Sequence, residues 1–172
     1  QVLHRGPYEV TLVSADVLNG HMPEALRDAV ALGVRSGNAV TDKLIESAPK
    51  LLVVGAFGVG TDQVDLTACS KKGISVVHAP YGSTESVAEL AFLNMMALAR
   101  RLCEHNTRMH QGMWEKSTRG AHEVRGKTLG IVGYGNIGEQ LAVHAKAFDM
   151  QVCYYDVADK PSFGANACDA LE

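Results

Sequence analysis

The chain has 172 residues, of which 47% are hydrophobic and 20% are charged, an ordinary balance for a folded protein of one large or two small domains. A formal net charge of -3 does not provide the clustered basic residues of a nucleic-acid-binding protein, so we expect small-molecule partners. The longest apolar run, Leu90 to Ala99, is shorter than the roughly 20 residues that span a bilayer, so we predict no membrane association. Widely spaced cysteines without a CxxC pair favour a reducing cytoplasm.

Strands and helices alternate in the predicted first half of the chain. We predict strands at 8–13, 31–34, 51–54 and 74–78, and helices at 22–30, 42–47 and 62–72. Gly73 ends the third of these helices, and the strands lead into loops that contain Gly, Pro or Ser. This alternation indicates an α/β fold.

A long helix is predicted after the turn at residues 79–82, capped by Ser83 or Thr84 and running to about His110. Its first half is apolar and its second half is polar, as expected of a helix that leaves a core. We therefore place the domain boundary on this helix. The predicted organisation is a substrate-binding lobe over 1–83, an interdomain helix over 84–110 and a nucleotide-binding domain over 111–172.

A complete GxGxxG motif, Gly133-Tyr134-Gly135-Asn136-Ile137-Gly138, directly follows the predicted buried strand 127–132. A helix and a second strand, 150–155, come after it. Gly133 permits the tight turn, Gly135 lets the backbone approach a pyrophosphate, and Gly138 allows the helix to pack closely on the strand. The free amides at the start of the helix then face the diphosphate, which predicts a dinucleotide site.

Asp156 ends the second strand, 23 residues after Gly133, close to the spacing of the acid that binds the adenosine ribose. A carboxylate would repel a 2′-phosphate, and residues 157–159 include no arginine, so NAD is favoured over NADP. The alternatives are a tight turn without a ligand, and a flavin site, because FAD uses the same motif.

Candidate substrate groups lie in the first half of the chain. Arg35 follows the strand 31–34, at the strand end where open α/β sheets bind ligands, and is either an anion-binding cation or a solvated surface residue. The loop 55–62 has three glycines that can align backbone amides around a carboxylate, or it is a flexible loop capped by Asp62. His78 has no carboxylate partner in sight and is predicted to be structural. No spacing resembles a zinc site, so we predict no metal.

Five sequence runs together resemble the family of D-isomer-specific 2-hydroxyacid dehydrogenases. They are VRSGNAVT (34–41), VVGAFGVGTDQVDL (53–66), KKGISVVHAPYGSTESVAEL (71–90), HQGMWEK (110–116) and RGKTLGIVGYGNIGEQL (125–141). The resemblance implies a flavodoxin-like substrate lobe and the first part of a Rossmann doubly wound parallel sheet, both incomplete. It is greatest to bacterial members that use NAD to oxidise D-3-phosphoglycerate to 3-phosphohydroxypyruvate at the start of serine biosynthesis.

By motif matching, the resemblance implies contacts to both ligands. The residues implied for the substrate, a small anionic 2-hydroxy acid, are Arg35, Val59, Gly60, Ser83 and Lys116. The residues implied for NAD are Gly133, Gly135, Asn136, Ile137, Gly138 and Asp156. Val59 and Gly60 would offer amides to the substrate carboxylate, and Arg35 and Lys116 would lie near its phosphate. Asn136 and Ile137 would contact the pyrophosphate, and Ser83 would lie in the hinge-side loop.

Two departures from the family pattern leave the substrate open. Gly37 stands where bacterial members have a second arginine, and Ala56 stands where other branches have one. With one cation fewer, a doubly charged phosphate is held less securely, which makes a glyoxylate or hydroxypyruvate reductase the alternative. A different class, a non-catalytic NAD-sensing binding protein such as a transcriptional corepressor, would share this fold.

The family's catalytic Arg, Glu and His are expected beyond Glu172, so no catalytic residue is assigned in this chain, and we expect the 172 residues to be a piece that cannot turn over alone. Trp114 lies in a polar segment before the nucleotide strand and predicts a homo-oligomer contact, which the resemblance also implies. The alternative is that Trp114 packs in a lid.

Overall fold

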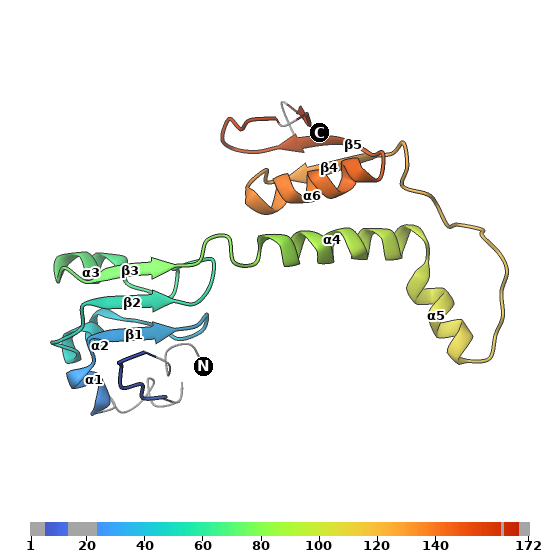
Figure 1. Ribbon diagram of the computed structural model, residues 1–172. Coiled ribbons are helices and arrows are strands. Elements are labelled where there is room, and N and C mark those ends of the chain that lie inside the picture. Colours follow the sequence, from blue (N-terminus) through green and yellow to red (C-terminus); the bar gives the residue numbers. More distant parts are fainter. Residues whose placement is uncertain (1–5, 14–23, 163, 169–172) are drawn as a thin grey trace. The chain divides into compact units, whose positions relative to one another are not determined.

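The computed structural model describes residues 6–13, 24–162 and 164–168. The chain divides into two compact units, Gln1–Gly82 and Ser83–Glu172, and each unit contains its own parallel sheet (Figure 1). The predicted α/β fold is therefore confirmed as two small parallel sheets with helices packed on them.

The sheet of the first unit has the order β1-β2-β3 and is parallel throughout. Its strands are β1 (Ala31–Val34), β2 (Val53–Ala56) and β3 (Ser75–His78), and its helices are α1 (Ala25–Asp28), α2 (Asp42–Ser47) and α3 (Leu66–Lys71). Apolar side chains from the strands, α2 and α3 form one core, in which Ile45 and Val54 are fully buried. Burial of this surface is the main force that holds the unit together.

One predicted element of the first unit is wrong, and several others have different bounds. Residues 8–13 form no strand, because they pair with none of the strands in the described part of the chain, and Leu12 is 86% exposed. The helix predicted over 22–30 is described only from residue 24, where it is limited to α1; residues 22 and 23 lie outside the described part. The strand predicted at 51–54 is shifted by two residues to β2.

Helix α3 begins at Leu66 rather than at residue 62, because the preceding residues bond to another loop. The Val40 amide donates to the Gln63 carbonyl at 2.8 Å, and the Asp65 amide donates to the Val40 carbonyl at 2.9 Å. Asp65 then caps the helix, since its carboxylate accepts from the Ala68 amide at 2.9 Å. Tertiary pairing thus removes one turn from the predicted helix.

The sheet of the second unit has the order β4-β5-β6 and is also parallel. Its elements are α4 (Thr84–Ala99), α5 (Leu102–His110), β4 (Thr128–Val132), α6 (Asn136–Ala147), β5 (Gln151–Tyr155) and β6 (Asn166–Ala167). Helix α6 lies between the strands and α4 (Figure 1), and the Phe92 and Phe148 rings meet between the two helices with centroids 4.8 Å apart. The β4-turn-α6-β5 unit that the sequence predicted is present.

The single helix predicted from residue 84 to about 110 is wrong, because it breaks between α4 and α5. Arg101 has a left-handed conformation with φ of 52°, which ends the regular helix. The last carbonyl of α4, on Ala99, accepts from the His122 amide at 2.7 Å instead of continuing the helical ladder. The break directs α5 away from the packed face of α4. None of the described helices has the length and apolar character that a membrane crossing needs.

Candidate functional site

The glycine-rich turn joins β4 to α6 in the second unit. Gly133 has a φ of +90°, which glycine adopts without the strain of other residues, and its amide donates to the Tyr155 carbonyl at 2.8 Å. A Cβ atom on Gly138 would lie 2.5 Å from the Gly133 carbonyl oxygen. The turn therefore needs glycine at both ends, first for its conformation and then for the close approach of α6 to β4.

Gly135, in the middle of the motif, is not required by the protein itself. A Cβ atom there would meet no protein atom within 4 Å. Gly135 is also the N-cap of α6 and has no side chain to accept from the first helical amides, so those of Asn136 and Ile137 have no acceptor in the described part of the chain. Open space in front of unpaired amides at the start of a 12-residue helix fits a phosphate group.

Asp156 follows β5 and its carboxylate reaches the glycine turn. Its Oδ1 accepts from the Ala158 amide at 2.9 Å, and its Oδ2 accepts from the Tyr134 amide at 2.6 Å. These two amides, Ala158 first, hold the pKa of Asp156 below its ordinary value, so the carboxylate is charged at neutral pH. An ionised carboxylate has about four acceptor positions, which leaves room for ribose hydroxyls. The residues present thus fit an adenosine dinucleotide.

The loop after β2 in the first unit presents backbone amides. The amides of Val59 and Gly60 have no acceptor among the described residues, and both residues are exposed. The Val59 carbonyl is turned the other way, since it bonds to Nδ1 of His78 at 2.8 Å. With His78 on the carbonyl, the two amides are free for an anion such as a carboxylate.

Arg35 lies at the carboxyl end of β1 and is exposed. Its carbonyl accepts from the Asn38 amide in a tight turn, and Gly37 within that turn has a φ of +96°. Ala56, at the end of β2, is 2% exposed. Neither of the two positions where the family pattern allows another arginine therefore supplies a cation here.

Ser83 and Lys116 belong to the second unit. Ser83 occupies the N-cap position of α4, although its hydroxyl makes no capping bond, and its carbonyl accepts from the Val87 amide at 3.0 Å. Lys116 lies in the exposed segment 111–120 that follows α5. Arg35, in contrast, belongs to the first unit.

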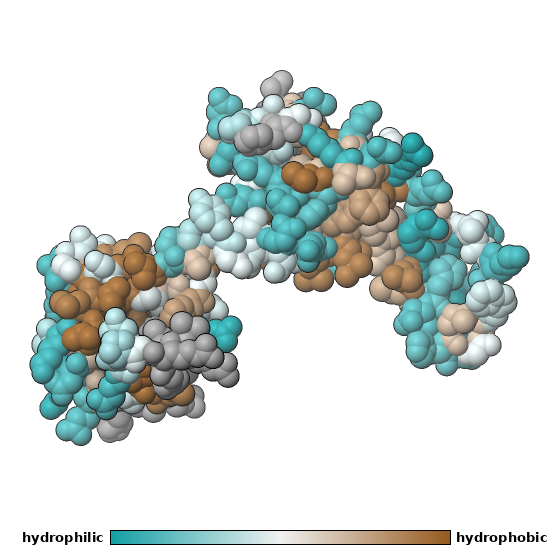
Figure 2. Space-filling view, in the orientation of Figure 1, coloured by the Kyte–Doolittle hydropathy of each residue, from teal (hydrophilic) through white to brown (hydrophobic). Residues whose placement is uncertain are grey.

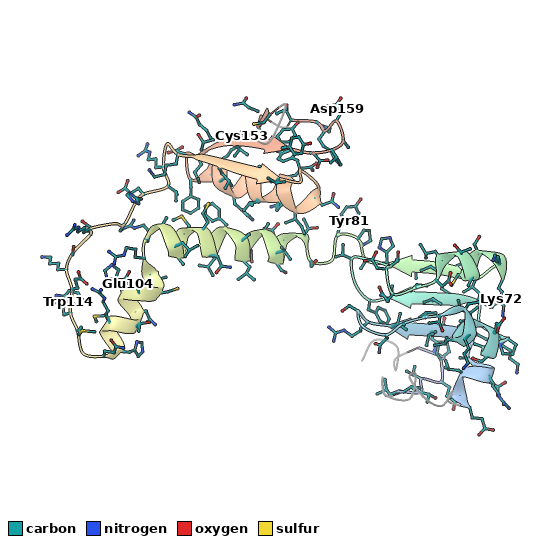
Figure 3. All side chains as sticks on the ribbon, turned by 180° about the vertical axis from the view of Figure 1, so that it is seen from behind. Lys72, Tyr81, Glu104, Trp114, Cys153 and Asp159 are labelled. Atoms are coloured by element: carbon teal, nitrogen blue, oxygen red, sulfur yellow. The ribbon has the colours of Figure 1, made fainter. Side chains whose placement is uncertain are left out.

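A network of charged side chains shapes α5 and the segment after it. Arg101 donates to both Glu104 carboxylate oxygens and to the Arg119 carbonyl, and Arg108 pairs with both Glu104 and Glu115. Hydrogen bonding to Arg101 lowers the pKa of Glu104, which keeps the network charged at neutral pH. Trp114 stands on this segment beside α5, 76% exposed (Figure 3).

The sequence did not reveal the role of Tyr134 in the dinucleotide site, and it gave no partner for His78 in the first unit. Tyr134 has the most buried large side chain at this site, at 1% exposure, and its amide binds Asp156. The available signal was an aromatic residue within the GxG turn, because a large ring at such a position is expected to be buried in the core. His78 was predicted to be structural, without a known partner. Its bond to the Val59 carbonyl now shows that it orients the loop after β2.

The geometry defines a class of α/β protein in which a glycine-rich turn and an acid after the second strand form half of a dinucleotide site. A family model described as D-isomer specific 2-hydroxyacid dehydrogenase, catalytic domain, matches residues 1–155. The chain belongs to the D-isomer-specific 2-hydroxyacid dehydrogenase family, as the sequence runs indicated.

Curated relatives point to one branch of this family. The chain is 42% identical over 157 residues to D-3-phosphoglycerate dehydrogenase of Dictyostelium discoideum, covering 91% of this chain and 39% of that protein. It is 44% identical over 163 residues to D-3-phosphoglycerate dehydrogenase of Haemophilus influenzae, covering 94% of this chain and 40% of that protein. The chain thus spans about 40% of the length of these curated relatives.

Solved structures show the same fold. A D-lactate dehydrogenase from Aquifex aeolicus, complexed with NAD and lactic acid, matches with a TM-score of 0.75 and 34% identity, covering 87% of this chain and 46% of that one. The TT0316 protein from Thermus thermophilus matches with a TM-score of 0.78 and 30% identity, covering 93% of this chain and 50% of that one. Both matches extend over strands and helices of the two units.

Proposed function

We propose that the protein is an NAD-dependent dehydrogenase that oxidises D-3-phosphoglycerate to 3-phosphohydroxypyruvate in serine biosynthesis. The observation that carries the proposal is the dinucleotide half-site, in which open space at Gly135 meets unpaired amides and Asp156, in a chain that is 42 to 44% identical to D-3-phosphoglycerate dehydrogenases. The activity is proposed for the protein at its full length, and the experiments below use that length.

Different residues would bind the cofactor and the substrate. The amides of Asn136 and Ile137 would bind the pyrophosphate, and Asp156 would accept hydrogen bonds from the adenosine ribose. Bound NAD would accept the hydride from C2 of the substrate. The amides of Val59 and Gly60 would hold the substrate carboxylate, and their fixed dipoles need no reorganisation when the hydride leaves.

Cations complete the proposed substrate site. Arg35 and Lys116 would lie near the phosphate, and Ser83 would lie in the hinge-side loop. We further propose that the first unit is a flavodoxin-like lobe and that the second is the first part of a Rossmann sheet, with the domains divided as 1–83, 84–110 and 111–172. We also propose a cytoplasmic setting, which the widely spaced cysteines without a CxxC pair favour.

Turnover by the full-length protein tests the proposal. We expect NADH to form when the protein is given NAD and D-3-phosphoglycerate, and D-glycerate to react far more slowly because it has no phosphate for Arg35. A protein that binds NADH and oxidises neither acid would contradict the dehydrogenase and favour the NAD-sensing class.

A second candidate, a glyoxylate or hydroxypyruvate reductase, is favoured by the arginine positions. Gly37 and the buried Ala56 leave one cation fewer than a doubly charged phosphate commonly receives. This candidate predicts faster consumption of NADH with glyoxylate or hydroxypyruvate than with 3-phosphohydroxypyruvate. The ratio of the kcat/KM values for these three oxo acids decides between the two.

Self-association is part of the proposal, because α5 and the exposed segment after it present apolar groups. Trp114 is 76% exposed, Leu102, Met109 and Met113 are each about half exposed, and none of the residues of α5 is buried. Figure 2 shows further hydrophobic side chains at the surface of the second unit, and Leu90 and Leu98 of α4 are among its exposed ones. An aromatic side chain on a segment held by ion pairs is suited to anchor a second copy.

A Trp114→Ala variant should therefore weaken the oligomer by roughly 30-fold or more in dissociation constant, the effect of losing about 2 kcal/mol from an aromatic anchor. Sedimentation velocity over a dilution series measures this, with Trp114→Phe as the control that keeps an aromatic ring. An unchanged sedimentation coefficient for Trp114→Ala at every dilution would show that Trp114 packs elsewhere.

A further inference from the structure

Two stacked tyrosines hold the loop that follows β5. Tyr134 lies in the glycine turn and Tyr154 lies in β5, with ring centroids 4.0 Å apart and an interplanar angle of 18°. Both are buried, yet each hydroxyl has an acceptor on this loop. Oη of Tyr154 donates to the Lys160 carbonyl at 2.9 Å, and Oη of Tyr134 donates to the Ser162 carbonyl at 3.4 Å. Two rings anchored in the core therefore fix two points of the loop backbone.

Tyr134 also fixes the beginning of the same loop. Its amide donates to Oδ2 of Asp156 at 2.6 Å, so one residue holds Asp156 through its backbone and Ser162 through its side chain. The Ser162 carbonyl also accepts from the Ala165 amide at 2.7 Å, where the chain returns toward β6. The residue between the first two glycines of the motif thus joins the phosphate turn to both ends of the segment 156–162. Asp159, labelled in Figure 3, lies between those ends.

We infer that Tyr134 and Tyr154 are positioning residues that set the preference for NAD over NADP, by holding Asp156 and the segment 157–162 against the phosphate turn. The inference rests on the proposed dinucleotide site. It adds the two side chains that hold the segment carrying Asp156 in place. Both hydroxyls bond to the loop backbone and not to the Asp156 carboxylate. Each acts through the backbone that carries the contact.

The preference requires a carboxylate that stays in place. An Asp156 side chain held by an amide on either oxygen keeps its negative charge where a 2′-phosphate would lie, and the two anions repel each other. A loop free to move would let the carboxylate turn away. Lys160, on the same loop, is close enough to help lower the pKa of Asp156, and a freed loop would make this cation available to the phosphate.

The test compares phenylalanine variants of the full-length protein, because phenylalanine keeps the stacked ring and removes only the hydroxyl. Tyr134→Phe, Tyr154→Phe and the double variant are titrated with NADH and with NADPH by fluorescence. The matched control is Tyr155→Phe, the next residue of β5, whose hydroxyl has no partner in the described part of the chain.

We expect each single variant to bind NADH about 3- to 10-fold more weakly, the size of one lost hydrogen bond, while NADPH binds as before or more tightly. The NADPH-to-NADH ratio of Kd values should therefore fall at least about 10-fold in the double variant and stay unchanged in Tyr155→Phe. In steady-state turnover, KM for NAD should rise while kcat stays constant, because the hydroxyls do not reach the reacting carbon.

Separate outcomes contradict the inference and the proposed function. Wild-type protein that binds neither nucleotide would overturn the dinucleotide site and the inference with it. Wild-type protein that binds NADH, with phenylalanine variants that keep the wild-type Kd ratio or lose both nucleotides equally, would overturn the inference alone. If Tyr134→Phe does not fold in a thermal melt, Tyr154→Phe decides the result by itself.

Discussion

A Gly138→Ala variant of the full-length protein should unfold with about 2 kcal/mol less free energy than the wild type and should no longer bind NADH. Alanine in a helix is favoured over glycine by about 1 kcal/mol. Against this gain, the new Cβ would stand 2.5 Å from the Gly133 carbonyl oxygen and 3.2 Å from Cγ2 of Ile131. A backbone oxygen cannot rotate away as a side chain can, so α6 must move off β4, at a cost of about 3 kcal/mol.

Chemical denaturation followed by circular dichroism measures the loss in stability, and fluorescence titration with NADH measures binding. Gly135→Ala is the control for the stability measurement, because it adds the same methyl group where no protein atom lies within 4 Å. A Gly138→Ala protein of wild-type stability would show that the turn opens easily, and would contradict the requirement for close packing at this position.

A Gly135→Ser variant should keep or slightly raise the stability of the protein while NADH binding falls roughly 100-fold. Serine is a better N-cap than glycine by a few tenths of a kcal/mol, because its hydroxyl accepts from the first helical amides. The same amides are those proposed to bind the pyrophosphate, and losing two charge-assisted hydrogen bonds removes about 3 kcal/mol of binding. Stability and affinity should thus change in opposite directions.

The two measurements are a thermal melt and an NADH titration of the same preparation. Gly135→Ala adds volume without a hydroxyl and should reduce affinity with no gain in melting temperature. NADH binding of wild-type strength by Gly135→Ser would mean that the pyrophosphate does not approach this turn, and the proposed cofactor site would be wrong.

Much of the second unit could be predicted because each local signal agreed with its neighbours. The apolar runs of β4 and β5, the helical spacing of α6 and the glycines between them all favour one structure, and none of them depends on a distant segment. Gly138 could be assigned to packing and Gly135 to ligand approach from the motif alone. The Cβ contact at Gly138 agrees with its packing role, whereas the ligand role of Gly135 stays a prediction.

Elements that depend on tertiary partners could not be predicted in the same way. Alternation at residues 8–13 is a property of the residues alone, whereas a strand also needs a neighbour to pair with. The break at Arg101 depends on acceptors and donors far along the chain, including the Arg119 carbonyl and the His122 amide. Periodicity continues smoothly through such a position, so the helix was predicted to be too long.

The candidate site shows the same division. The position of Asp156 beside the glycine turn could be predicted from its distance along the chain from Gly133, because one βαβ unit has a nearly constant length. The role of Tyr134 could not, since its hydroxyl and amide bind residues more than 20 positions away. Assigning Arg35, Lys116 and Ser83 needed the family resemblance, because exposed polar side chains have no periodicity that points to a ligand.

The short bond between the Ala99 carbonyl and the His122 amide, 2.7 Å long, has a consequence for evolution. It joins the two ends of an excursion that contains α5 and the exposed segment after it, so the chain leaves the second unit and returns to it at one point. Insertions or deletions within such an excursion change the loop-closure entropy only slightly and leave the sheet intact. Parts of the excursion other than the proposed substrate residue Lys116 can therefore change in length or surface during evolution while the glycine turn stays as it is.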